Sequence, residues 1–210
     1  MSRRGEIYES LDLIASESRR CGDLVKNLLT FSRTTPMNLQ STNLNQVIDR
    51  SLRLVQHQFD LAGIQVQQQL DPDLPPVHCD GAQIEQVLLA LIMNAIDAMP
   101  QGGNLWLTTS RNSDDSTVRV VVRDDGAGIP AEILPRIFEP FLTTKETGRG
   151  VGLGLAISQN ILERHHGSIE VQSEVGRGTT FTVTLPWEGS TKQHDPSPSG
   201  EVAAAASGRG

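Results

Sequence analysis

The sequence contains few cysteines and no excess of basic residues, and both shortages exclude classes of protein. Its two cysteines, Cys21 and Cys79, form no Cys-x-x-Cys pair and no cysteine–histidine cluster. This argues against a disulfide framework and a structural zinc site, and it favours a reducing, cytoplasmic location. The chain has 18 basic and 25 acidic residues, a net charge of −7 and a pI near 5.2. It therefore lacks the basic surface that generic nucleic-acid binding requires.

Long apolar runs are also missing. No uninterrupted stretch approaches the roughly 20 residues that a membrane-spanning helix needs, and the N-terminus has no signal-peptide core. We therefore expect no membrane contact by this chain. The composition includes 37% hydrophobic residues and 19 glycines among 210 residues, without an internal repeat. Such values are ordinary for a globular protein and exclude wholesale disorder.

Residues 1–35 predict one long helix with a heptad stripe. Apolar or small residues recur at alternating spacings of four and three, at Ile7, Leu11, Ile14, Ser18, Cys21, Val25 and Leu28. This repeat is typical of a helix packed in a bundle, although docking on its own domain would also bury the stripe. We prefer a bundle between subunits because the spacing is closer to 3.5 than to 3.6 residues. Pro36 ends the helix, and a linker over 36–44 follows.

The main domain is predicted over 45–188. We expect helices at 45–59, 82–99 and 154–165, and strands at 64–70, 105–109, 118–123, 168–173 and 179–185. This order predicts an α+β fold in which helices cover one face of an antiparallel or mixed sheet. Residues 189–210 contain Ser-Pro-Ser-Pro and four consecutive alanines, and we expect a disordered tail there.

Four motifs in this domain have the chemistry of a nucleotide site. The first is Asn94, whose carboxamide oxygen within an apolar helix suits Mg²⁺; a satisfied polar residue at a helix edge is the alternative. The second is Asp124-Asp125-Gly126-Ala127-Gly128, directly after a strand. Its glycines allow a planar ligand to approach the backbone, and an ionised Asp124 would accept from the amine of adenine but reject the carbonyl of guanine. An ordinary glycine turn is the alternative.

The third motif, Gly148-Arg149-Gly150-Val151-Gly152-Leu153-Gly154, opens the helix at 154–165. Alternating glycines at a helix N-terminus expose N–H groups that favour a polyphosphate. The motif is neither a P-loop nor a dinucleotide fingerprint, because the required lysine and glycine positions are absent. Lys145 and Arg149 could meet phosphate oxygens, within a polar segment from Thr143 to Arg149 that could form a lid.

The fourth motif is Gly178-Thr179-Thr180, at the start of the last strand. The hydroxyl of Thr179 could bridge to the base, although threonine also commonly begins a strand.

Together these motifs resemble the ATP-binding domain of sensor histidine kinases, in the superfamily that includes gyrase and heat-shock chaperone ATPases. The four boxes of that family, N, first glycine, F and second glycine, match Asn94, Asp124-x-Gly126-x-Gly128, Phe138 with Phe141, and Gly150-x-Gly152-x-Gly154. The resemblance covers about residues 6–187 and implies a Bergerat-type α/β sandwich that binds ATP and Mg²⁺, with Asn94 as the metal ligand. It implies catalytic roles for Asn94, Lys145 and Arg149. The nucleotide-binding residues that it implies are Asn94, Asp97, Asp124, Gly126, Gly128, Ile129, Phe138, Phe141, Thr144, Gly150, Val151, Gly152, Leu153, Gly154 and Thr179.

The same resemblance implies partners and a reaction. Residues 1–35 are similar to the second helix of a dimerisation and histidine-phosphotransfer hairpin, here truncated, which implies a homodimer in the parent protein. The γ-phosphoryl group of ATP would pass to a histidine on a hairpin helix that is not present, and then to an aspartate of a response-regulator receiver domain. The segments at 94–103 and 139–145 are most similar to the nitrogen-regulation type.

The sequence departs from the pattern of this superfamily in two respects. None of the five histidines, His57, His78, His165, His166 and His194, matches the phosphoacceptor position, and only His194, in the tail, precedes an acid. The gyrase branch carries a water-activating glutamate where this chain has Ala90, so slow hydrolysis and transfer to another nucleophile are expected. A serine kinase of the anti-sigma-factor type and a non-catalytic dimerisation or scaffold module are the alternatives.

Overall fold

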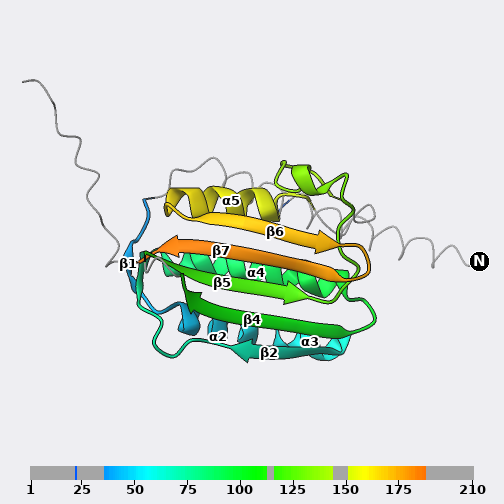
Figure 1. Cartoon of the computed structure of the whole chain (residues 1–210), viewed down its shortest axis with the longest axis horizontal. Helices are drawn as coiled ribbons and strands as arrows, with labels where there is room; N and C mark the ends of the chain where they lie inside the picture. The colour runs from blue at the N-terminus through cyan, green and yellow to red at the C-terminus, as the bar shows by residue number, and fades with distance from the viewer. Residues whose placement is uncertain (1–21, 23–35, 113–115, 144–150, 188–210) are drawn as a thin grey trace, which may run out of the picture.

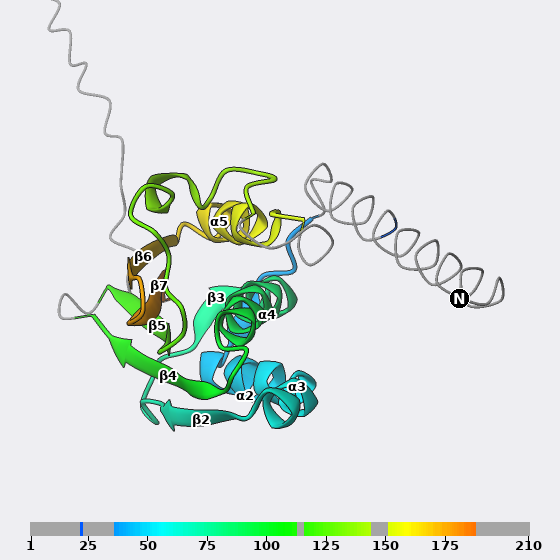
Figure 2. The same ribbon diagram turned by 90° about the vertical axis from the view of Figure 1, so that its right-hand side faces the viewer.

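The computed structural model describes residue 22 and the ranges 36–112, 116–143 and 151–187. These residues form two layers, a five-stranded sheet and a set of helices that all lie on one of its faces (Figures 1 and 2). The predicted helix within 1–35 and the predicted tail over 189–210 lie outside the described residues, apart from Gly22. Among the described residues, no helix has both the length and the apolar character needed to cross a bilayer.

The sheet is mixed, as the order of elements predicts. Its spatial order is β2-β4-β5-β7-β6, with β2 parallel to β4 and every other pair antiparallel. The strands are β2 (Ile64–Gln69), β4 (Gly103–Arg111), β5 (Thr117–Asp124), β6 (Ser168–Glu174) and β7 (Gly178–Pro186). Each overlaps a predicted strand, and its ends differ from the predicted ends by at most two residues. Alternate residues of β4, β5 and β7 are buried toward the helices, and this alternation is what the sequence reveals.

A second, two-stranded sheet is not predicted from the sequence. It pairs β1 (Gln40–Thr42) antiparallel with β3 (Val77–Cys79). Strands of three residues are too short to show an alternating pattern, so only the tertiary pairing reveals them. The pairing ties the segment that follows Pro36 to the start of the next long helix.

That helix, α4 (Gly81–Ala98), is the centre of the helical layer and agrees with the predicted 82–99 within one residue. Asp80 caps the N-terminus of this helix, because its side chain accepts hydrogen bonds from the backbone N–H groups of Ala82 and Gln83. Six of its residues are buried in the core: Ile84, Val87, Leu88, Leu91, Ile92 and Ala95. The helix α5 (Gly154–Arg164) packs beside it, and a short 3₁₀ helix, η1 (Leu134–Arg136), precedes α5.

The prediction of one continuous helix over 45–59 is wrong. The structure has two helices, α2 (Leu44–Leu54) and α3 (Gln56–Ala62), with a break at Val55. Val55 leaves the helical region, at φ −112° and ψ 11°, yet Val55 and Phe59 are both buried. Periodicity cannot reveal the break, because an uninterrupted helix would also bury residues at this spacing.

Candidate functional site

Asp124 ends β5 and is almost wholly buried, with 4% of its surface exposed. Its Oδ1 accepts hydrogen bonds from the backbone N–H groups of Gly126 (2.9 Å) and Thr179 (3.2 Å). Its Oδ2 accepts none from the described residues. Burial raises the pKa of this carboxyl group; the two backbone donors oppose the shift, and the neighbouring Asp125 adds to it. The site therefore contains a fixed, buried acceptor with one oxygen not engaged by the described part of the protein.

The two glycines of the first glycine box are required by close contacts with the rest of the chain. A Cβ at Gly126 would lie 2.6 Å from the carbonyl oxygen of Ala98, at the end of α4. Gly128 has φ +71°, and a Cβ there would collide with the backbone of Glu174 at the end of β6. The loop after β5 is thus held between α4 and the β6–β7 turn, and this packing explains the glycines without a ligand.

A small hydroxyl network supports the same loop. The Ser173 hydroxyl donates to Gly178 O (3.0 Å) and accepts from the backbone N–H of Ile129 (2.8 Å). Thr179 Oγ1 lies 2.9 Å from Ser173 Oγ, and because the Ser173 proton is already used, the Thr179 hydroxyl is the donor. The sequence does not single out Ser173, since a serine in an alternating strand gives no signal of its tertiary partners.

The described part of the second glycine box covers Val151, Gly152, Leu153 and Gly154. Gly152 has φ +69°, and its carbonyl accepts from the backbone N–H of Phe141 (2.9 Å). Phe141 also has a positive φ, +68°, and is 57% exposed, whereas Phe138 is partly buried against the core. The other predicted site residues of this region, Thr144, Lys145, Arg149 and Gly150, lie outside the described residues.

The helix α4 connects the two glycine boxes. Near its middle, Ala90 faces the start of α5, where a Cβ at Gly154 would lie 3.7 Å from the Ala90 Cβ. At its end, Ala98 O accepts from the N–H of Ala127 in the first glycine box (3.0 Å). Asn94, which is half-buried, lies one turn after Ala90 and one turn before Ala98, and Asp97 is exposed. The structure therefore brings Asn94, Asp124 and both glycine boxes to one region.

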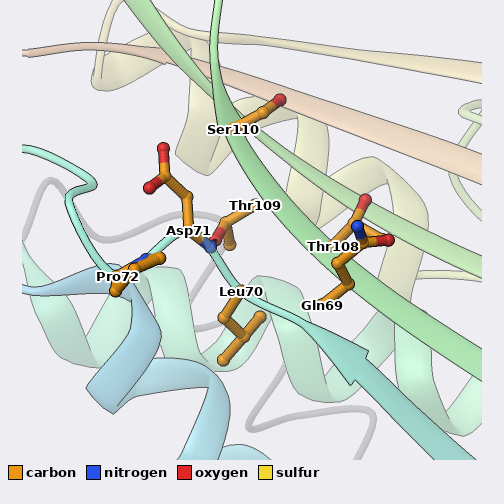
Figure 3. A pocket seen from close by; sticks show the side chains of 7 residues that line it. All are labelled: Gln69, Leu70, Asp71, Pro72, Thr108, Thr109 and Ser110. Atoms are coloured by element: carbon orange, nitrogen blue, oxygen red, sulfur yellow. Dashed lines mark hydrogen bonds between the residues drawn. The ribbon is translucent and has the colours of Figure 1, made fainter.

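A separate hollow lies away from these residues. It measures about 520 Å³ and is lined by Gln69, Leu70, Asp71, Pro72, Thr108, Thr109 and Ser110 (Figure 3). Leu105 of β4 pairs with Asp124, so this hollow lies toward the opposite end of β4. Its buried Thr109 hydroxyl serves the fold, because it accepts from the Asp71 N–H (2.9 Å) and donates to Asn45 Oδ1 (3.0 Å).

Comparison with known proteins identifies the family and the fold. The family described as histidine kinase-, DNA gyrase B- and HSP90-like ATPase matches residues 79–189. The chain belongs to this ATPase family. The matched range begins at the end of β3 and includes α4, β4, β5, α5, β6 and β7, so it contains every box discussed above. The Bergerat-type sandwich expected from the sequence is confirmed.

The individual relatives are kinases, and several of them are named as sensor histidine kinases. The chain is 36% identical to Sporulation kinase E of Bacillus subtilis over 88% of its own length and 25% of the relative. It is 39% identical to the sensor histidine kinase ZraS of Escherichia coli K12, over 87% and 38%. The chain therefore spans about a quarter to two fifths of these curated relatives.

Among solved structures, the catalytic domain of histidine kinase ThkA superposes with a TM-score of 0.65 at 33% identity, over 72% of this chain and 97% of that one. ThkA in complex with the response regulator protein TrrA superposes with a TM-score of 0.73 at 28% identity, over 89% and 53%. Membership of the family supports ATP as the ligand. Among the described residues, no group of three or more His, Cys, Asp or Glu side chains could form a metal cage.

Proposed function

We propose that the chain is the ATP-binding catalytic portion of a sensor histidine kinase. It would transfer the γ-phosphoryl group of ATP to a histidine on a hairpin helix outside this chain, for relay to an aspartate of a response regulator. The observation that carries the proposal is the arrangement of Asp124, whose Oδ1 is held by two backbone donors while Oδ2 takes none from the described residues. A carboxylate oxygen in this setting accepts the exocyclic amine of adenine and disfavours the carbonyl of guanine.

The phosphate end of the nucleotide would lie toward α5. The described N-terminus of α5 begins at Gly154, and the positive end of the helix dipole favours anions. We assign Lys145, Arg149 and Gly150 to the same region on the family pattern, with Thr144 and Phe141 as part of the segment that covers the nucleotide. Gly126, Gly128, Ile129, Val151, Gly152, Leu153 and Thr179 complete the proposed binding set. Catalysis would consist mainly of positioning and charge neutralisation.

Mg²⁺ would be held chiefly by the nucleotide phosphates and Asn94. Asn94 is half-buried on α4 between the contacts to the two glycine boxes, and its carboxamide oxygen is a ligand of the type that Mg²⁺ prefers. When bound, the ion would reduce the negative charge that an incoming imidazole meets. Asp97, three residues further along α4, is exposed, and we assign it a contact with the ion through water.

The absence of a base at Ala90 favours transfer to another nucleophile over hydrolysis. Ala90 lies at the contact between α4 and Gly154, one turn before Asn94, and its methyl group cannot activate water. A nucleotide held without rapid hydrolysis suits a kinase whose acceptor is supplied by another helix.

The wider assignments rest on the relatives and the sequence pattern. Residues 1–35 would form the second helix of a dimerisation hairpin, with a linker over 36–44, the catalytic domain over 45–188 and a tail over 189–210. A homodimer, a receiver domain as partner, a cytoplasmic location and the nitrogen-regulation type follow as parts of the same proposal. ThkA, which was solved with its response regulator, is a precedent for the receiver partner.

A labelling experiment tests this function. The chain is incubated with Mg²⁺ and γ-labelled ATP, alone and with the histidine hairpin of its parent protein. We expect no label on the chain and acid-labile label on the hairpin, because phosphohistidine is unstable in acid and phosphoserine is not. A hairpin whose acceptor histidine is replaced by alanine is the control. Strong self-labelling, acid-stable label, or label on the control hairpin would contradict the proposal.

A further inference from the structure

Three segments meet at Asp80, just before α4. Its Oδ1 caps α4 by accepting from the N–H groups of Ala82 (3.1 Å) and Gln83 (3.2 Å). Its Oδ2 accepts from the backbone N–H of Asn38 (3.1 Å), in the segment that follows Pro36, and from Gln83 Nε2 (3.0 Å). Burial raises the pKa of Asp80, but these four hydrogen bonds outweigh it and hold the pKa below the ordinary aspartate value, so the group is a carboxylate at neutral pH.

The backbone N–H of Asp80 binds a buried histidine from the other helix. It donates to His165 Nε2 (3.0 Å), while His165 Nδ1 lies 2.7 Å from the carbonyl oxygen of Ile161. A carbonyl oxygen only accepts, so Nδ1 carries the proton and Nε2 is the acceptor. His165 is 5% exposed and follows the last residue of α5. The imidazole thus joins the C-terminal turn of α5 to the cap of α4.

This junction sets the relative position of the two helices that border the nucleotide site. The C-terminus of α5 meets the N-terminus of α4 at Asp80, and the N-terminus of α5 meets Ala90 near the middle of α4, so the helices run antiparallel. Asn94 lies one turn beyond Ala90, and Gly154 opens α5. A shift of α5 along α4 at the junction would therefore change the separation of Asn94 from the second glycine box.

We propose that Asp80 and His165 are positioning residues that couple the 36–44 segment to nucleotide affinity. The N–H of Asn38 and the imidazole of His165 both bind Asp80, so a displacement of the segment acts on the α4–α5 junction. This inference rests on the proposed function, because it concerns the same nucleotide site. By the reciprocity of linked equilibria, a bound nucleotide must also strengthen the tie to Asn38.

Two substitutions separate the contacts of the junction. Asp80→Asn keeps one oxygen to cap α4, but it turns an amide NH₂ toward the Asn38 N–H, which also donates. Gln83 can rotate its own amide to compensate, whereas the backbone N–H of Asn38 cannot. His165→Phe keeps the ring volume and removes the acceptor for the Asp80 N–H. His165→Gln is the conservative variant, since its amide oxygen reaches about as far as Nε2.

Thr109→Val is the matched control. It removes a buried hydroxyl that binds Asp71 and Asn45 at the far end of β4, so it lowers stability through a lost internal hydrogen bond, as His165→Phe does. It leaves the α4–α5 junction untouched. A loss of affinity that merely follows lost stability would appear in this variant too.

The experiment measures ATP affinity by calorimetry on the full chain, with Mg²⁺, and backbone amide exchange at Asn38 with and without ATP. For His165→Phe and Asp80→Asn we expect Kd to rise by about fivefold or more, the lower end of typical coupling between sites. We expect parental affinity for Thr109→Val and partial recovery for His165→Gln. ATP should slow Asn38 exchange several-fold in the parent and not in His165→Phe.

The outcomes separate this inference from the proposed function. Parental affinity in both junction variants, or an equal loss in Thr109→Val, would overturn the coupling and leave the nucleotide site standing. Absence of ATP binding by the parent chain would overturn both. Failure of the hairpin labelling alone, with ATP bound and the variants weakened, would overturn the kinase reaction and leave the coupling intact.

Discussion

The substitution Asp124→Asn should weaken nucleotide recognition without disturbing the fold, because it changes the chemistry of a single side-chain atom, Oδ2. In the protein, Oδ1 accepts from Gly126 and Thr179, and the asparagine carbonyl oxygen can accept both of these hydrogen bonds. The substitution changes only Oδ2, which becomes an NH₂ group that donates. Burial raises the pKa of Asp124, so the fold makes the charged form of this carboxyl group less favourable than it is in water. We therefore expect the free energy of unfolding to change by less than about 1 kcal/mol at neutral pH.

The loss of ATP affinity should be much larger. A hydrogen bond to a charged group contributes about 1.5–3 kcal/mol, and its loss corresponds to a roughly 10- to 150-fold higher Kd. In addition, the new NH₂ group would face the donating amine of adenine. Inosine triphosphate carries a carbonyl at the same ring position, so the preference for ATP over inosine triphosphate should fall sharply or reverse. Calorimetric titration of both nucleotides into the parent and the variant measures this ratio.

Asp125→Asn is the neighbouring control with the same change of charge. Asp125 is exposed and binds the backbone N–H (2.7 Å) and side chain (2.8 Å) of Asn104, which holds the pKa of Asp125 below its usual range. Its substitution should lower stability slightly and leave the nucleotide ratio unchanged. The reasoning fails if Asp124→Asn binds ATP like the parent, if Asp125→Asn loses the same affinity, or if Asp124→Asn unfolds the protein.

Three further predictions follow from individual contacts. Gly128→Ala should lower the free energy of unfolding by more than about 1 kcal/mol, measured by urea denaturation, because the residue has φ +71° and a Cβ would collide with Glu174. Asn94→Ala should bind ATP with little dependence on Mg²⁺ in calorimetry while keeping the parental melting temperature within a few degrees, since its half-buried amide is proposed to hold the ion. The stabilisation lost in Asp80→Asn should be fully present above the ordinary aspartate pKa of 3.8 and should disappear as pH falls below this value, because the pKa of Asp80 is depressed in the folded protein. Urea denaturation of the parent and the variant over about pH 2–7 measures this dependence, and a stability difference that does not change with pH would contradict the prediction.

The sequence predicts most of the sandwich because its elements are long and periodic. The apolar spacing locates α4 within one residue, and alternation locates the five strands of the main sheet. The break at Val55 and the β1–β3 pair are missed, because a short strand or a buried bend leaves no periodic signal. The local sequence pattern predicts the regular helices and strands, whereas tertiary contacts determine the break at Val55 and the β1–β3 pairing.

The residues of the candidate site also fall into a group that the sequence predicts and a group that it does not. Asp124 and the glycines could be predicted, since their order along the chain is itself the signal. Ser173 and His165 could not, because each depends on partners distant in sequence, Ile129 in one case and Asp80 in the other. A lone serine or histidine has no distinguishing neighbours in the sequence, so residues that support a site are the hardest part of it to predict.

The first glycine box shows how the fold and the proposed site constrain the same residues. The collisions at Gly126 and Gly128 would exist without any nucleotide, so glycine there is explained by packing of the chain on itself. Asp124 is different: burial works against its charged form, and a neutral asparagine could accept the same two backbone hydrogen bonds. Packing alone therefore gives no reason for a carboxylate at this position. A ligand that donates to Oδ2 gives one, and for this reason Asp124, rather than the glycines, carries the functional argument.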